Sequence, residues 1–268
     1  MLHLMLAIAS ASALDIPHEH YELENGLDVI LIEDHSLPTV VVDTWYGVGS
    51  YDDPRGASGF AHLFEHLMFM GTERIGEGEF DKRMEIAGGW NNASTGADRT
   101  NYYDVGPAEL VDLLLFMEAD RMTGLDITQA KLDLQREVVR NERRQNYEDE
   151  PYGVMWLELS EMMYPDTHAY HWEGIGSHED LLAATLDTVQ TFYADWYSPD
   201  NATLCVSGDF DAEHVKARIE EWFGPLKPSG RTEHAEAPDI RAPVVREKTV
   251  QDQAPLEALV LAWHSPSY

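Results

Sequence analysis

The chain has 268 residues, of which 44% are hydrophobic and 10% aromatic, as expected for a large folded domain and not for a low-complexity segment. Its 49 acidic and 18 basic residues give a formal net charge of −31, which argues against binding to nucleic acid or to anionic membranes because like charges repel. Cys205 is the single cysteine, so an internal disulfide is excluded.

The first thirteen residues, MLHLMLAIASASA, combine an apolar run with an Ala-Ser-Ala sequence that is typical of a signal-peptidase site. The positively charged start of an ordinary signal is missing. We nevertheless expect residues 1–13 to be a signal peptide and the protein to be exported. No later stretch reaches the roughly 18 apolar residues that a membrane-spanning helix requires.

The region that follows predicts strands and then a helix. A hairpin is expected over residues 21–34, because Asn25-Gly26 is a favoured two-residue turn between strand-like runs. Residues 40–48 are rich in β-branched and aromatic side chains and predict another strand. After a glycine-rich loop, the apolar periodicity of residues 59–70 predicts a helix with Ser58 as its cap.

The rest of the main domain mixes helices and strands. Strands are expected over 90–105, as a pair, and around Cys205. Helices are expected over 79–87, 107–122 (opened by Pro107), 129–147, 152–163, 188–197 and 212–223. Strands and helices do not alternate strictly, so the predicted fold is α+β with a mostly antiparallel sheet flanked by helices.

A change in composition suggests a domain boundary. Residues 226–241 are rich in proline, glycine and charge and predict a linker after a main domain of residues 14–225. Residues 242–268 contain two strand-like runs, PVVREKTV and LEALVLAWHSPSY. We expect them to begin a second domain, and the chain to be a fragment of a larger protein.

Three titratable residues interrupt the apolar run GFAHLFEHLMFM. His62 and His66 are four residues apart, so a helix would project both from one face, where they could bind one metal ion. Glu65 lies between them, close enough to act on a water molecule. The order His-x-x-Glu-His is the inverted form of a known zinc-peptidase motif. Two histidines at this spacing also occur as ordinary core or surface residues.

A hydrolytic zinc site needs a third protein ligand. The predicted helix over residues 129–147 contains Glu137 and Glu142 among several arginines. The residues alone do not choose between the two, and either carboxylate could instead form surface salt bridges.

The segment GVGSYDDPRGASGFAHLFEHLMFMGT strongly resembles the inverted-zincin metallopeptidases of the pitrilysin, insulin-degrading enzyme and mitochondrial processing peptidase family. The likeness continues through GGWNNASTGADRTNYY, REVVRNE, HWEGIGSHEDL and YSPDNATLCVSGDF, and covers nearly all of residues 20–225. The resemblance implies the fold of the metalloenzyme domain of mitochondrial processing peptidase.

The resemblance also implies the site. In the family a distal glutamate lies some 75 residues after the second histidine; here 142 − 66 = 76, which matches Glu142. The implied ligands of one Zn²⁺ ion are thus His62, His66 and Glu142, with Glu65 as general base. Many relatives have another acid seven residues before the distal ligand, where this chain has Gln135. We expect this amide to be a weaker support for the ligands, with an effect on rate.

The activity implied is zinc-dependent endopeptidase hydrolysis of peptides or unfolded segments. Residues 91–95 resemble the edge strand on which relatives bind extended peptides, with Asn92 and Ala93 as candidate substrate contacts. The expected partners are a peptide and a second homologous half, in the same chain or another. The expected location is a bacterial periplasm or cell envelope. The alternative is a non-catalytic subunit or scaffold, since the family includes members that have lost the chemistry.

Two other groups invite a site but are predicted to be structural. His168 and His171, in the sequence HAYH, are expected to make ordinary polar contacts and not to form a second metal site. Four tryptophans are expected to pack in the core and not to form a ligand cage: Trp156, Trp172, Trp196 and Trp222.

Overall fold

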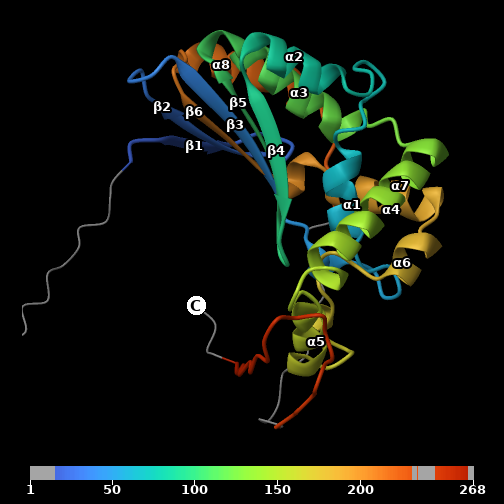
Figure 1. Cartoon of the computed structure of the whole chain (residues 1–268). Helices are drawn as coiled ribbons and strands as arrows, with labels where there is room; N and C mark the ends of the chain where they lie inside the picture. Colours follow the sequence, from blue (N-terminus) through green and yellow to red (C-terminus); the bar gives the residue numbers. More distant parts are fainter. Residues whose placement is uncertain (1–15, 231–233, 235–244, 265–268) are drawn as a thin grey trace, which may run out of the picture.

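The computed structural model describes residues 16–230, 234 and 245–264 (Figure 1). The predicted signal peptide and most of the predicted linker lie outside the described residues. None of the helices in the described ranges has both the length and the apolar character of a membrane-spanning segment.

The centre of the fold is a six-stranded sheet with the strand order β1-β2-β6-β3-β5-β4. The strands are β1 (Glu19–Glu22), β2 (Asp28–Glu33), β3 (Thr39–Tyr46), β4 (Trp90–Thr95), β5 (Thr100–Pro107) and β6 (Ala202–Gly208). Every neighbouring pair is antiparallel except β2 and β6. The predicted α+β fold with a mostly antiparallel sheet is therefore confirmed.

The helices form two groups around this sheet. Their bounds are α1 (Phe60–Leu67), α2 (Glu79–Ala87), α3 (Val111–Thr123), α4 (Gln129–Arg143), α5 (Val154–Met163), α6 (His178–Ala183), α7 (Leu186–Trp196) and α8 (Ala212–Trp222). In Figure 1, α2, α3 and α8 lie over one face of the sheet, whereas α1, α4, α6 and α7 gather beside β4.

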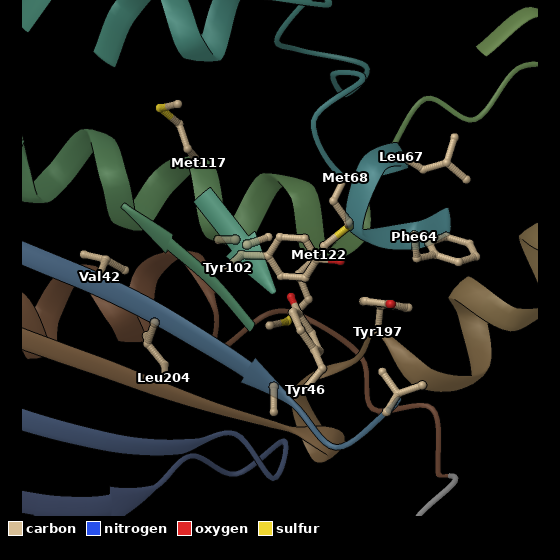
Figure 2. Packing of buried hydrophobic residues seen from close by; sticks show 14 of the residues in the cluster. Val42, Tyr46, Phe64, Leu67, Met68, Tyr102, Met117, Met122, Tyr197 and Leu204 are labelled. Carbon is tan, nitrogen blue, oxygen red and sulfur yellow. The ribbon is translucent and has the colours of Figure 1, made fainter. Parts of the chain in front are cut away.

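The strands bury alternate residues against the first group of helices. In β3, Val40, Val42, Thr44 and Tyr46 are buried, whereas the residues between them are at least partly exposed. This period of two is typical of a sheet with one covered face. The covered face and the second group of helices meet in an aromatic cluster around Tyr197 (Figure 2).

Several predicted boundaries differ from the observed ones. Pro107 ends β5 and does not open a helix, because a 3₁₀ turn over Ala108–Leu110 precedes α3. The α-helical part of α4 ends at Arg143 and continues as a π-helical turn over Arg144–Glu148. Helix α6 was not predicted; its side-chain cap is Ser177, whose hydroxyl accepts from the Asp180 amide.

The predicted cap of the first helix is also wrong. Ser58 donates its hydroxyl to Asp180 and does not cap α1. The amides of Gly59 and Ala61 donate instead to the Asp53 carboxylate, at 2.7 and 2.9 Å. A buried carboxylate from the preceding loop thus satisfies the free amides of the helix start, where negative charge is favoured.

Residues 245–264 form no strand, contrary to the prediction for residues 242–268. The segment runs beside α5 (Figure 1), where the Tyr152 hydroxyl donates to the Leu256 carbonyl at 2.9 Å. A strand is stable only when its backbone groups pair with a neighbour, and no described strand lies along this segment. The proposed domain boundary stays a prediction.

Candidate metal centre

Helix α1 separates an apolar face from a polar one. Phe60 and Phe64 are buried and pack on Phe192 of α7, with ring centroids 5.8 and 5.5 Å apart. Phe64 also contacts Tyr197 at 5.0 Å (Figure 2). Because these rings fix the rotation of the helix, its other face, with His62, Glu65 and His66, points away from the aromatic cluster.

Helix α4 packs against α1 and brings in Glu142. Oε2 of Glu142 lies 3.6 Å from Nε2 of His62 and 3.3 Å from Nε2 of His66. One ligand atom from each of the three residues lies within 4.8 Å of the other two. This is the only such group of three or more potential ligands in the described part of the chain.

These separations suit a tetrahedral zinc site. Two ligand atoms bound to zinc at 2.0–2.1 Å with a tetrahedral angle are about 3.4 Å apart. Two imidazoles and one carboxylate are also a ligand set found in hydrolytic zinc enzymes, which leave a fourth position open. The three residues therefore fit the ion that the sequence pattern implies.

The electrostatics favour the protonation states that a metal ion requires. The hydrogen bond from His66 lowers the pKa of Glu142, so its carboxylate is ionised at neutral pH. Burial lowers the pKa of His62, whose ring is therefore neutral. Metal ligands must be deprotonated to bind, so these two groups are prepared for a cation.

The two carboxylates left open by the sequence have different surroundings. Glu137 is exposed on α4 and pairs with Arg140, whereas Glu142 faces the two histidines. Gln135 is buried two turns before Glu142, and its amide donates to the Met70 sulfur at 2.7 Å. Among the described residues it makes no hydrogen bond to the three candidate ligands.

Glu65 lies in the same cavity as His62 and Glu142. The cavity is open, with a volume of about 770 Å³. Thr95, at the end of edge strand β4, donates its hydroxyl to Oε2 of Glu65 at 2.5 Å. Sequence reasoning did not find this contact, although Thr95 lies in the segment GGWNNASTGADRTNYY that carried part of the resemblance.

The predicted substrate contacts lie farther along the same strand. Asn92 and Ala93 belong to β4, whose one neighbour among the described strands is β5. The Asn92 side chain accepts a hydrogen bond from the Ala93 amide at 2.9 Å. They do not line the cavity, whereas the residues that follow them in the chain, Ser94 to Ala97, form part of its lining. The role predicted for Asn92 and Ala93 stays a prediction.

His168 and His171 make ordinary polar contacts, as predicted. The His168 ring accepts from the Tyr170 amide at 3.0 Å, and Nδ1 of His171 is 2.9 Å from the Tyr164 carbonyl. They are not part of a candidate metal group.

The prediction for the tryptophans is only partly right. Trp196 is buried and Trp222 packs on the core, but Trp172 lines the cavity and Trp156, 55% exposed, lines it as well. Helix α5, which carries Trp156, stands outside both helix groups (Figure 1).

Comparison with known protein families decides which group of proteins has this architecture. The model of the family described as insulinase (peptidase family M16) matches residues 28–171, which include His62, Glu65, His66 and Glu142. The chain belongs to peptidase family M16. A second model, described as the peptidase M16 inactive domain, matches residues 183–268. The resemblance expected from the sequence is thus confirmed.

Individual M16 relatives agree with this assignment. The chain is 34% identical to the zinc protease PqqE of Helicobacter pylori, over 78% of this chain and 47% of that protein. A crystal structure of a protease from Helicobacter pylori has a TM-score of 0.78 at 32% identity and covers 82% of this chain and 53% of that one. The periplasmic protease PqqL from Escherichia coli shares the fold, with a TM-score of 0.75 at 23% identity over 84% and 25% of the two chains.

The chain spans about half the length of the Helicobacter pylori proteins that it matches. A structure of the first half of PqqL alone also matches, with 82% of this chain and 48% of that one covered. The coarse prediction of a relationship to zinc proteases is therefore confirmed, and the activity of this chain is a matter for proposal.

Proposed function

We propose that this chain is the zinc-binding half of an M16 endopeptidase that hydrolyses peptides or unfolded segments. The observation that carries the proposal is the meeting of His62, His66 and Glu142 within 4.8 Å, at an open cavity that His62, Glu142 and Glu65 line. A damaged motif would favour the non-catalytic alternative, but His62, Glu65, His66 and Glu142 are all present in the sequence, which supports the enzyme.

The residues have distinct roles in this proposal. His62, His66 and Glu142 would hold the zinc ion. When bound, zinc polarises the scissile carbonyl and makes water acidic enough to attack it near neutral pH. Glu65 accepts the proton of the attacking water and returns it to the departing amine, as a general base and then a general acid. Thr95 holds the Glu65 carboxylate at the end of the strand nearest to the substrate.

Edge strand β4 offers a place for the substrate. Among the described strands only β5 pairs with it, so an extended peptide could add to its outer side through main-chain hydrogen bonds. The Ala93 amide, which now donates to the Asn92 side chain, would be freed for the peptide by rotation of that side chain. Binding of this kind tolerates many sequences, as a peptidase that acts on unfolded segments requires.

Substitution of Glu65 by Gln tests the proposal. The zinc content of the purified variant should equal that of the wild type, because Glu65 is not one of the three ligands. Hydrolysis of a fluorogenic peptide library should be lost. A wild-type protein that binds no zinc, or a variant that cleaves as fast as the wild type, would contradict it. A scaffold subunit would keep its partner binding after this substitution.

Export and a second homologous half are further parts of the proposal. The apolar run and Ala-Ser-Ala sequence of residues 1–13 support export. The first-half structure of PqqL supports a second half, in the same chain or another.

If the protein is exported, residues 1–13 should be missing from protein isolated from the producing cell, which N-terminal sequencing would detect. Hydrolysis by this chain should rise when a homologous second half is supplied.

A further inference from the structure

The cavity beside the candidate metal centre has a wall of aromatic side chains. Apart from the histidine of the metal group, its aromatic lining residues are Tyr147, Trp156, Tyr164, Tyr170 and Trp172. Hydrogen bonds fix the wall: the Trp172 indole donates to the Ser50 carbonyl at 3.1 Å, and the Tyr170 hydroxyl to Asp98 at 2.5 Å. Tyr164 and Tyr170 pack edge to face, with ring centroids 5.5 Å apart.

Besides the candidate ligand Glu142 and the candidate general base Glu65, one further carboxylate lines this cavity. Glu173 lines the cavity and is half-buried. The Ser160 hydroxyl of α5 donates to its Oε1, which fixes the side chain. Burial raises the pKa of Tyr147, the charges of Glu173 and Glu142 raise it further, and the charge of Arg143, which does not line the cavity, lowers it.

The charges of the cavity do not balance. Three carboxylates line it, from Glu65, Glu142 and Glu173, and no lysine or arginine of the described residues does. A Zn²⁺ ion on the proposed ligands would offset two of the three negative charges, which leaves one. Because Glu65 and Glu142 lie beside the proposed zinc ligands, Glu173 is the carboxylate that has no counter-charge among the described lining residues.

We infer that this cavity binds a cationic side chain, lysine or arginine, of the peptide substrate, with Glu173 as the residue that determines the specificity. A cation would pair with the carboxylate and lie against aromatic faces, both of which attract positive charge. An apolar or aromatic side chain would instead cover a half-buried carboxylate that has a hydrogen bond from Ser160 but no counter-charge, which is costly. The inference rests on the proposed peptidase function and names its substrate class.

Peptide binding tests the inference without the need for hydrolysis. The protein is the zinc-loaded Glu65→Gln variant. The probes are peptides that differ only in one residue, lysine or the uncharged norleucine of equal chain length, placed at successive positions. At one position the lysine peptide should bind about tenfold more tightly by calorimetry, as a charge-assisted contact of this kind allows.

Two further variants in the same background locate the effect. Glu173→Gln keeps an oxygen for Ser160 and should abolish the preference for lysine. Glu179→Gln removes the same charge from an exposed position on α6, outside the cavity lining, and should keep the preference. Equal binding of the two peptides, a preference that survives Glu173→Gln, or tighter binding of a phenylalanine peptide would overturn the inference. Loss of zinc would instead count against the proposed function.

Discussion

The hydroxyl of Thr95 donates a hydrogen bond to the Glu65 carboxylate at 2.5 Å and so joins the edge strand to the candidate general base. The two residues are 30 positions apart in the sequence and belong to β4 and α1. Since β4 is also the strand to which we propose that a peptide adds, one side chain connects the proposed place of substrate binding with the proposed general base.

Substitution of Thr95 by Val should lower kcat by about 10–100-fold, because valine keeps the shape of the side chain and removes the donor that orients Glu65. KM and zinc content should change little, since Thr95 is not a ligand. Thr95→Ser retains the hydroxyl and should recover most of the rate. Steady-state kinetics with a fluorogenic peptide measure both variants, and equal losses in the two would argue against a role for the hydroxyl.

The zinc affinity should depend on Glu142 and not on Glu137. Glu142→Gln replaces an ionised ligand by a neutral amide, so we expect the affinity for zinc to fall at least about 100-fold. Glu137→Gln changes the same helix and removes the same charge, but from an exposed ion pair, and should leave zinc binding as it is. Competition with a chromophoric chelator measures both, and similar affinities in the two variants would refute the assignment of the ligand.

The close approach of Gly59 and Gly176 should be essential for stability. A Cβ atom on Gly176 would lie 2.4 Å from the Ser58 carbonyl oxygen, and the residue has a φ of +71°. Gly176→Ala should therefore lower the free energy of unfolding by more than about 3 kcal/mol. Gly56→Ala is the matched control: its φ is +72° and no atom lies within 4 Å of the new Cβ, so it should cost only about 1–2 kcal/mol.

Thermal unfolding of the two alanine variants measures this difference. The melting temperature should fall by roughly 2–4 °C for each kcal/mol in a domain of this size. If Gly176→Ala melts at the same temperature as Gly56→Ala, contact between the two loops contributes nothing beyond the backbone conformation.

His35 should carry a proton at a higher pH than an ordinary histidine. Nδ1 of His35 lies 2.6 Å from Asp209 and Nε2 lies 3.1 Å from Glu33, and the hydrogen bond with Asp209 is the main cause of its raised pKa. The pair therefore stabilises the fold fully below the unfolded pKa of about 6.5, and this contribution is lost as the pH rises through the folded value.

NMR titration of the His35 ring should show the raised pKa, and Asp209→Asn should lower it. The melting temperature of Asp209→Asn should fall below that of the wild type at pH 5.5 and approach it at pH 9. A deficit that grows with pH would have the opposite sign and would refute the linkage.

Much of the candidate site could be predicted because its signal is local. The alternation of apolar and titratable residues over residues 59–70 predicts both the helix and the common face of His62, Glu65 and His66, and the structure has that helix. Glu142 is different, since it is 76 residues from His66 and looks like any other carboxylate of a charged helix. Only the family resemblance distinguished it from Glu137 before the structure placed it beside the histidines.

The errors arise where distant contacts decide the outcome. Serine often caps helices, but the Ser58 hydroxyl donates to Asp180 instead. The Asp53 carboxylate accepts the hydrogen bond from the Gly59 amide at the start of α1. Trp156 was expected in the core because tryptophan is largely buried on average, yet it lines an open cavity. The link between Thr95 and Glu65 also depends on how a strand and a helix lie together, which no short sequence pattern records.

The position of β6 between β2 and β3 sets an order of events during synthesis. β2 and β3 are consecutive in the chain, yet β6, which begins at Ala202, separates them in the sheet. A nascent chain that ends before this strand has a gap in the middle of its sheet and two unpaired edges facing it. The sheet can therefore be completed only after about residue 208 has left the ribosome. Until then, chaperones or rapid elongation must keep the two unpaired edges from aggregating.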